Sequence, residues 1–257
     1  MPAVTVVRSG EVEPFVNPET GLTVRPTVGP GTQFAALEQA VIECPPGRSR
    51  PIAVGDAEET LFVLAGEGAI HVGGESHGLV SEVGVSLRPR SEFVLESAGP
   101  VPLRAVAVRV PDPEAGPVSS SAATIRRLDE QELEPATTQR QFRIVADPGS
   151  GLRSATHFVG YIPSDRAPDH FHTYDEVIYV LDGEGVMHAG DVTRPVSPGA
   201  CIQLPARTVH CLQSTGEDPM RVVAVFRPAG SPADAYFPDG TPAYQSSSGS
   251  TPEEESP

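Results

Sequence analysis

One stretch of the chain brings together residue types that bind transition metals. It reads DHFHTYDEVIYVLDGEG over residues 169–185 and holds His170, His172 and Glu176. Side chains alternate faces in an extended segment, so His170 and His172 project to the same side and both can reach one ion. Glu176 opens a β-branched and aromatic run that predicts a strand ending at Asp182. The stretch therefore predicts metal binding at the start of a strand.

A fourth candidate ligand, His210, comes later in ACIQLPARTVHCL, beyond the turn residues Gly199 and Pro205. A second apolar strand there can return His210 to the same cavity. Imidazoles with a carboxylate suit divalent iron, manganese, nickel, copper or zinc rather than calcium or magnesium. We expect one such ion per chain, and the residues do not choose among the five metals. An octahedral ion would keep positions open for water, oxygen or substrate.

At these residues the chain resembles the cupin superfamily. The first cupin motif has a glycine, His-x-His, a glutamate and a second glycine. Here His170, His172, Glu176 and Gly183 match it, and Ser164 stands at the leading glycine.

The second cupin motif is matched by Gly199, Pro205 and His210, whereas Arg207 and Ser214 replace a glycine and an asparagine. The resemblance implies that all four ligand positions of the family are present. The departures affect turn residues, so they put loop geometry in doubt rather than metal binding.

The chain also contains an internal repeat, which identifies a duplicated module. ETLFVLAGEGAIHVG over 59–73 aligns without gaps with EVIYVLDGEGVMHAG over 176–190. Allowing a small loop difference further on, Gly84 aligns with Gly199 and Pro89 with Pro205.

The repeat shows which module carries ligands. His170 and His172 align with Ala53 and Gly55, and His210 aligns with Phe93 or Val94. Only the glutamate is kept, as Glu59, and one carboxylate among alkyl groups is not a transition-metal site. We therefore expect the first module to be metal-free.

Short apolar runs separated by Gly and Pro turns predict an all-β chain. The clearest runs are 39–44, 60–64, 101–110, 155–162 and 221–226. The cupin resemblance implies two tandem jelly-roll barrels. We expect a metal-free N-terminal barrel over 1–110, a Pro, Gly and Ser-rich linker over 111–123, a metal-binding C-terminal barrel over 124–244 and a disordered tail over 245–257.

Composition limits the partners. With 34 acidic and 18 basic residues, the formal net charge is -16, which disfavours nucleic acid and anionic membrane surfaces. No leader pattern and no apolar run of about 20 residues is present, so we expect a cytoplasmic protein. The 3 cysteines fit no disulfide or zinc spacing and are expected to be reduced. A monomer and a homodimer are equally compatible with the sequence.

Three further residues are candidates for catalysis or substrate contact. His157 alternates with Val159 and Tyr161 in a predicted strand and is expected to face the ligand cavity. Tyr174 lies within the metal motif. Arg207 has the fork geometry that binds carboxylates, although the sequence favours the simpler interpretation of a solvated loop position.

Three functions remain open from the sequence. The cupin resemblance implies first a dioxygenase-type oxidoreductase acting on a small carboxylate or enolisable substrate. A non-oxidative metal enzyme is the alternative, such as a hydrolase resembling ureidoglycine aminohydrolase, an isomerase or a lyase; that aminohydrolase family has Gln where His210 stands. The third is a barrel that binds a small molecule without turnover.

Overall fold

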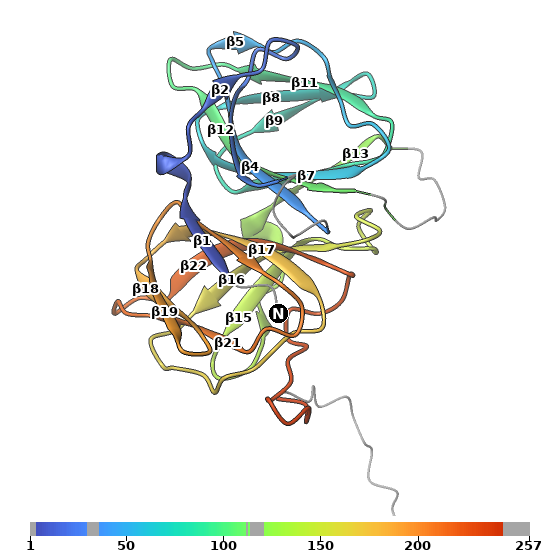
Figure 1. The fold of residues 1–257 in the computed structure, drawn as a ribbon. Helices are drawn as coiled ribbons and strands as arrows, with labels where there is room; N and C mark the ends of the chain where they lie inside the picture. The colour runs from blue at the N-terminus through green and yellow to red at the C-terminus, as the bar shows by residue number, and fades with distance from the viewer. Residues whose placement is uncertain (1–3, 30–35, 112, 114–120, 244–257) are drawn as a thin grey trace, which may run out of the picture.

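The computed structural model describes residues 4–29, 36–111, 113 and 121–243, and its regular structure is almost entirely β-strand. The strands form two stacked barrels of the cupin jelly-roll type, as the sequence predicted (Figure 1). No helix in the described ranges has the length and apolar character needed to cross a membrane. The tail predicted over 245–257 and most of the linker predicted over 111–123 lie outside the described residues.

The N-terminal barrel packs a seven-stranded sheet, in the order β13-β10-β7-β12-β4-β3-β2, against a four-stranded sheet, β6-β11-β8-β9. The elements of the first half of the chain are β1 (Thr5–Arg8), η1 (Ser9–Glu11), β2 (Phe15–Val16), β3 (Thr23–Val28), β4 (Glu38–Cys44), β5 (Gly47–Arg48), β6 (Ile52–Ala53), β7 (Glu58–Ala65), β8 (Gly68–Val72), β9 (Glu75–Leu79), β10 (Val83–Leu87), β11 (Glu92–Ser97) and β12 (Leu103–Val110).

The C-terminal barrel repeats this arrangement with a seven-stranded sheet, β1-β20-β17-β22-β16-β15-β14, and a three-stranded sheet, β19-β18-β21. Its half of the chain supplies β13 (Ala123–Arg127), η2 (Leu128–Glu130), β14 (Glu134–Pro135), β15 (Gln141–Ala146), β16 (Thr156–Ile162), β17 (Asp175–Asp182), β18 (Gly185–Ala189), β19 (Val192–Val196), β20 (Ala200–Leu204), β21 (His210–Ser214) and β22 (Met220–Arg227). Each of the five apolar runs named in the sequence overlaps a strand: β4, β7, β12, β16 and β22.

The two barrels exchange their outermost strands. β1, from the first half, pairs with β20 of the C-terminal sheet, from Thr5 opposite Gln203 to Arg8 opposite Ala200. Reciprocally, β13 pairs with β10 of the N-terminal sheet. β1 therefore lies outside the N-terminal barrel, although it falls within residues 1–110, the range expected for that barrel. β13 pairs with the N-terminal sheet, although most of it falls within residues 124–244, the range expected for the C-terminal barrel.

The two seven-stranded sheets also pack face to face. Phe62 and Val106 of the N-terminal sheet share one buried cluster with Val177, Val223 and Val225 of the C-terminal sheet. Residues on the opposite face of each sheet, such as Leu61 and Ile178, fill the interior of their own barrel. Because both faces are covered, residues 61–65 of β7 and 177–181 of β17 form continuous apolar runs rather than alternating patterns.

The strand ladders correct one part of the repeat alignment. Phe62 pairs with Gly84, and its repeat equivalent Tyr179 pairs with Cys201, so the gapless register continues and Gly84 is not the counterpart of Gly199. That counterpart is Glu82, which takes a left-handed backbone with φ 67, beside φ 88 at Gly199. The expected pairing of the two glycines was wrong because Glu82 adopts the turn conformation that usually favours glycine.

Candidate metal centre

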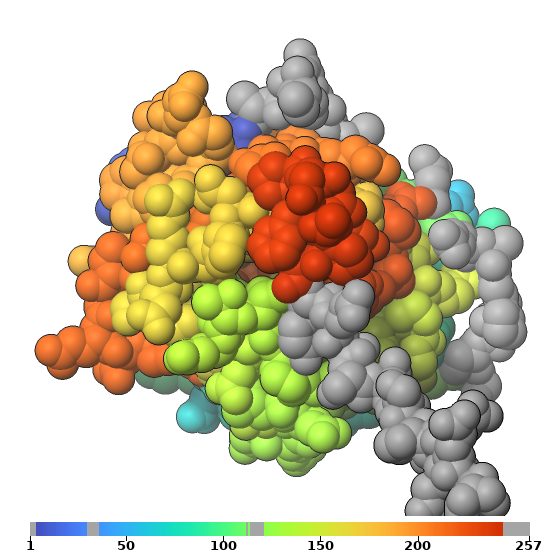
Figure 2. Space-filling view, turned by 90° about the horizontal axis from the view of Figure 1, so that it is seen from below, coloured from blue at the N-terminus to red at the C-terminus, as the bar shows by residue number. Residues whose placement is uncertain are grey.

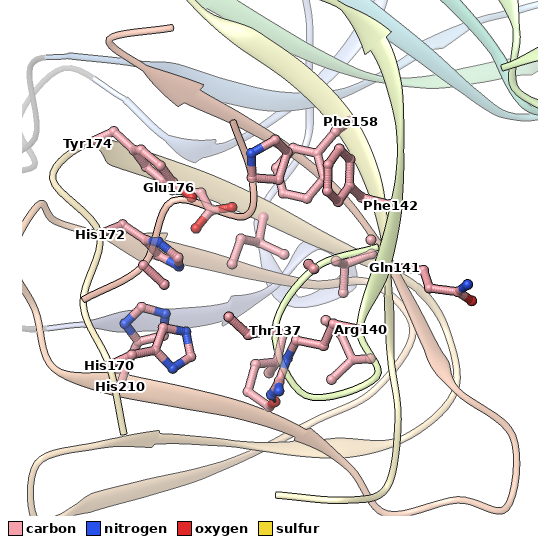
Figure 3. A pocket seen from close by; sticks show the side chains of 18 residues that line it. Thr137, Arg140, Gln141, Phe142, Phe158, His170, His172, Tyr174, Glu176 and His210 are labelled. Carbon is pink, nitrogen blue, oxygen red and sulfur yellow. Dashed lines mark hydrogen bonds between the residues drawn. The ribbon is translucent and has the colours of Figure 1, made fainter. Parts of the chain in front are cut away.

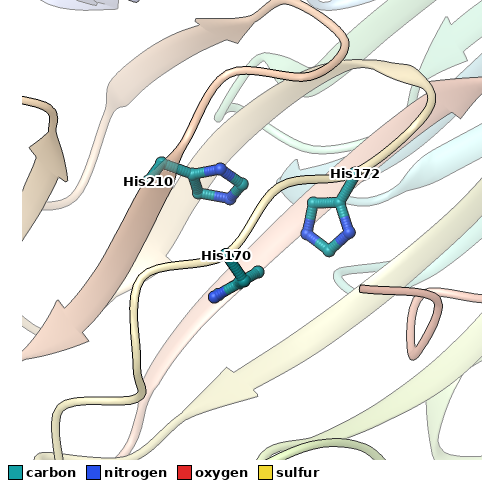
Figure 4. A group of neighbouring side chains, drawn as sticks. All are labelled: His170, His172 and His210. Carbon is teal, nitrogen blue, oxygen red and sulfur yellow. The ribbon is translucent and has the colours of Figure 1, made fainter. Parts of the chain in front are cut away.

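Three histidines meet at one end of the C-terminal barrel (Figure 4). His170 and His172 lie in the extended segment between β16 and β17, and His210 begins β21. The backbones of His170 and His210 exchange two hydrogen bonds, of 3.0 and 2.8 Å. The ligand atoms of all three imidazoles lie within 4.8 Å of one another, as the His-x-His spacing predicted. Among the described residues, this is the one group of at least three possible metal ligands.

Each imidazole is oriented by a backbone carbonyl. The Nδ1 atoms of His170, His172 and His210 lie 2.9, 2.7 and 2.8 Å from the oxygens of Pro168, Asp234 and Thr208. A carbonyl oxygen only accepts hydrogen bonds, so each Nδ1 carries the proton and donates. The lone pair is therefore on Nε2 in all three rings, the arrangement by which proteins orient metal-binding histidines.

Burial also keeps these imidazoles neutral. It lowers the pKa of His170 and holds that of His210 well below its ordinary value. Burial, followed by the neighbouring His170, lowers the pKa of His172 to about 3. A metal binds only the unprotonated ring, so the three donors are ready for an ion at physiological pH. The donor set fits a divalent transition metal in type, tautomer and charge.

Glu176, the fourth predicted ligand, lines the same cavity but stands outside the group of mutually close donor atoms. It lies at the start of β17 and is 5% exposed. Burial raises the pKa of its carboxyl group to about 8. The structure therefore places a neutral, buried carboxyl group on the wall beside the three imidazoles.

The cavity next to the histidines is small and largely apolar (Figure 3). Its volume is about 80 Å³, well below the several hundred Å³ of a typical drug-sized site. Phe142, Phe158, Ile178, Leu212 and Val222 form apolar walls. A ligand of only a few heavy atoms fits this space.

Tyr174 lines the cavity beside the histidines. Its ring stacks on His172 at 4.7 Å between centroids and on Phe226 at 3.8 Å. Burial raises the pKa of its hydroxyl well above the ordinary value, so the phenol stays protonated. Tyr174 holds the His172 ring in place and offers a donor rather than a base.

His157 does not face the cavity, contrary to the prediction. It is 1% exposed and its ring meets Phe62 of the N-terminal barrel edge-on at 6.0 Å. The cavity is lined instead by Phe158, Gly160 and Ile162, the alternate residues of β16. The sequence pattern could not separate the two faces of this strand, because both are buried.

Arg207 also lies away from the cavity lining. Its side chain is exposed, and its backbone has φ 62, the left-handed conformation that the missing glycine would adopt. Its backbone N–H donates to the carbonyl of His172 at 2.7 Å. The residue supports the metal-binding segment through its backbone, and its guanidinium is not among the groups that line the pocket.

The sequence reasoning missed Arg140, which does line the cavity. It precedes β15 by one residue and is two residues from Phe142, which lines the same cavity. The strand period therefore offered a signal that could have found it. Burial lowers the pKa of its guanidinium.

The segment after β22 was also missed. We call residues 230–243 the C-terminal strap. Asp234 supplies the carbonyl that orients His172, and Tyr236 exchanges backbone hydrogen bonds of 2.8 and 2.9 Å with Phe171. Pro232 and Ala235 line the cavity. Figure 2 shows the strap in red on the face of the C-terminal barrel, beside the yellow segment before β17.

Comparisons with known proteins agree with this architecture. The cupin domain family model matches residues 157–226, which hold all four predicted ligands. No curated protein matches the sequence.

Among solved structures, a protein from Pseudomonas aeruginosa provisionally named glyoxylate-induced protein superposes with a TM-score of 0.76 at 18% identity, over 88% of this chain and 89% of that one. Protein Ylba from E. coli gives a TM-score of 0.72 at 11% identity, over 88% and 91% of the two chains. A mutant oxalate decarboxylase from Bacillus subtilis gives 0.70 at 12% identity, over 91% of this chain and 79% of that one. At these identities the likeness concerns the fold.

Proposed function

The chain is a member of the cupin superfamily, and we propose that its C-terminal barrel is a mononuclear metal enzyme acting on a small organic acid or enolisable compound. The observation that carries the proposal is the set of three neutral imidazoles, each with Nδ1 bound to a carbonyl and Nε2 left for an ion. The cavity beside them restricts the substrate to a few heavy atoms.

His170, His172 and His210 would hold the ion, and Glu176 lines the same cavity. A divalent iron, manganese, nickel, copper or zinc ion at this place would supply a Lewis acid, and a redox-active one could also use dioxygen. The chain contributes a mostly apolar lining, and burial raises the pKa of Glu176, which suits a proton donor. The net charge of -16 agrees with a small-molecule substrate rather than a nucleic acid.

The first form of the reaction that we propose is dioxygen-dependent oxidation. The protein is purified without added metal and analysed for elemental content, then loaded separately with each of the five metals. Oxygen uptake is followed on a panel of short 2-oxo acids and small diketones. Uptake with one metal form that disappears in His172→Ala supports the proposal, and no uptake with any metal excludes the oxidative form on this panel.

A non-oxidative reaction is the second candidate, favoured by the buried carboxyl group of Glu176 in the mostly apolar cavity lining. The fold neighbours include oxalate decarboxylase from Bacillus subtilis. Carbon dioxide or ammonia release under argon from small dicarboxylates and ureido acids measures this form. If a metal binds stoichiometrically and neither assay detects turnover, the site is one that binds a small molecule without converting it.

A further inference from the structure

Arg140 is the one arginine among the described residues that line the pocket, and one of its hydrogen-bond donors has no partner there. Arg140 is 8% exposed, so its guanidinium is almost entirely removed from solvent. Its Nη2 donates to the carbonyl of Leu212 at 2.6 Å and lies 3.7 Å from the Cys211 sulfur. Its Nη1 is buried without a hydrogen-bond partner among the described residues. A buried donor without a partner is costly, which calls for an explanation.

Three of the partly buried arginines differ from Arg140 in their charge environment. Arg25, Arg153 and Arg221 each form an ion pair with a carboxylate, at 2.9, 3.2 and 2.7 Å. Within the described part of the chain, Arg140 has no ion pair. Its contacts are the Leu212 carbonyl and the Cys211 sulfur, and the three imidazoles in the pocket are neutral, so no carboxylate is paired with its positive charge.

The position of this charge is specific. The residue reaches the pocket from the loop before β15, whereas the three histidines reach it from the segment before β17 and from β21 (Figure 3). Most of the remaining lining residues are apolar, which strengthens electrostatic attraction inside the cavity. An anion that entered the pocket would therefore meet a preplaced, uncompensated guanidinium.

We propose that Arg140 binds a carboxylate group of the substrate, and that the substrate is a small carboxylic acid with a second oxygen function facing the histidines. This inference rests on the proposed metal site and goes further, because it names the residue and the chemical class. Planar carboxylates match the fork of a guanidinium. The volume of the cavity, about 80 Å³, restricts the class to acids of the size of a short 2-oxo acid, 2-hydroxy acid or dicarboxylate.

The test compares an acid with its uncharged amide. Ligand-observed NMR titrations measure the dissociation constants of pyruvate and of pyruvamide, which have nearly the same shape. Both are measured with the zinc-loaded and with the metal-free protein. We expect pyruvate to bind roughly tenfold or more tightly than pyruvamide in both forms, because hydrogen bonds between charged groups exceed those to a neutral amide. A preference present only with zinc would assign it to the metal and overturn the role of Arg140.

Variants test whether Arg140 causes the preference for pyruvate over pyruvamide. Arg140→Gln should abolish the preference for pyruvate, and Arg140→Lys, which keeps the charge but loses the fork, should retain part of it. Arg194→Gln removes the same charge from an exposed position of β19 and should leave the ratio unchanged. Zinc affinity and thermal melting are measured for each variant, to show that the pocket is still folded.

The outcomes separate this inference from the proposed function. If the wild-type protein binds zinc stoichiometrically but binds pyruvate no better than pyruvamide, or does not bind pyruvate at all, only the role of Arg140 is overturned. If no transition metal binds, the proposed function fails, and a preference for pyruvate in the metal-free protein still supports Arg140. If Arg140→Gln does not fold, the wild-type comparison and Arg140→Lys decide.

Discussion

The strands of the two barrels pair in the same register, and the barrels differ in the side chain that occupies one equivalent position. In the C-terminal barrel Ala189 of β18 pairs with His210, and in the N-terminal barrel the equivalent Val72 pairs with Phe93. Phe93 is 1% exposed and belongs to the core of its barrel. The same backbone therefore supports either a packed interior or a hollow one with imidazoles. A metal site here depends on removing apolar side chains as well as on supplying ligands.

A second difference between the barrels concerns the backbone. Gly55, the repeat equivalent of His172, has φ 69, a backbone conformation that residues other than glycine rarely adopt. Ala53, the equivalent of His170, is exposed in a two-residue strand. The first barrel has thus lost both the ligand residues and the extended segment that would aim them inward.

Equivalent substitutions in the two barrels should have opposite consequences, and these are the largest effects we expect. His210→Ala should lower metal affinity by more than about 100-fold, since losing a ligand exceeds the loss of a ligand's hydrogen-bond partner. Phe93→Ala should leave metal content unchanged and reduce the free energy of unfolding by about 3–5 kcal/mol, because it empties a packed core. Elemental analysis and urea unfolding measure the two quantities. Metal loss in Phe93→Ala would contradict the comparison.

Because the barrels exchange strands, we expect the stability of each barrel to depend on a strand from the other half of the chain. Val6 of β1 packs on the core of the C-terminal barrel, and Val7 packs on the cluster between the barrels. Deleting residues 1–12 should therefore lower the free energy of unfolding of the C-terminal barrel by about 3 kcal/mol, from the burial of these valines. Zinc release during urea unfolding reports on that barrel specifically.

A point variant controls for the deletion. Val6→Ala should weaken the C-terminal barrel, whereas Val16→Ala should not, because Val16 is 64% exposed on β2. Unchanged zinc release after the deletion would mean that β1 adds nothing to the barrel with which it pairs.

The sequence predicted the histidine cluster because ligand spacing and strand period are local properties. It placed His157 on the wrong face because β16 is buried on both sides, and hydrophobic pattern is then uninformative about direction. The carbonyls that orient the imidazoles carry no side-chain signal, so Asp234 could not be recognised. The exchange of β1 and β13 is a long-range pairing that periodicity does not encode, although both strands precede a similar 3₁₀ turn.

His157, which is buried between the two barrels, should make the free energy of unfolding depend on pH. Burial lowers the pKa of His157 to about 3, and its Nδ1 has no partner among the described residues. The unfolded chain then binds a proton more readily than the folded one, so the stabilisation is full above about pH 6.5 and falls as the pH drops toward 3.

Between pH 7 and pH 5 this residue alone should cost about 2 kcal/mol of unfolding free energy. His157→Gln, which does not titrate, should be less stable than wild type at pH 7 and lose about 2 kcal/mol less over this range. Urea unfolding of the metal-free protein at both pH values measures the difference, in which the other histidines cancel. Parallel pH profiles for the two proteins would show that His157 is not a neutral buried residue.

Removing the C-terminal strap should have the smallest of these effects, a change in zinc affinity, and Asp234→Ala is its control. The chain after β12 leads toward β13, whereas the chain after β22 crosses the metal-binding face and places the Asp234 carbonyl 2.7 Å from the Nδ1 atom of His172. Ending the chain after Ala229 should lower zinc affinity about tenfold, because the tautomer and orientation of His172 are no longer fixed. Asp234→Ala keeps the backbone carbonyl and should bind zinc as the wild type does. Competition with a chromogenic chelator measures both, and equal losses in the two variants would assign the effect to the carboxylate instead of the carbonyl.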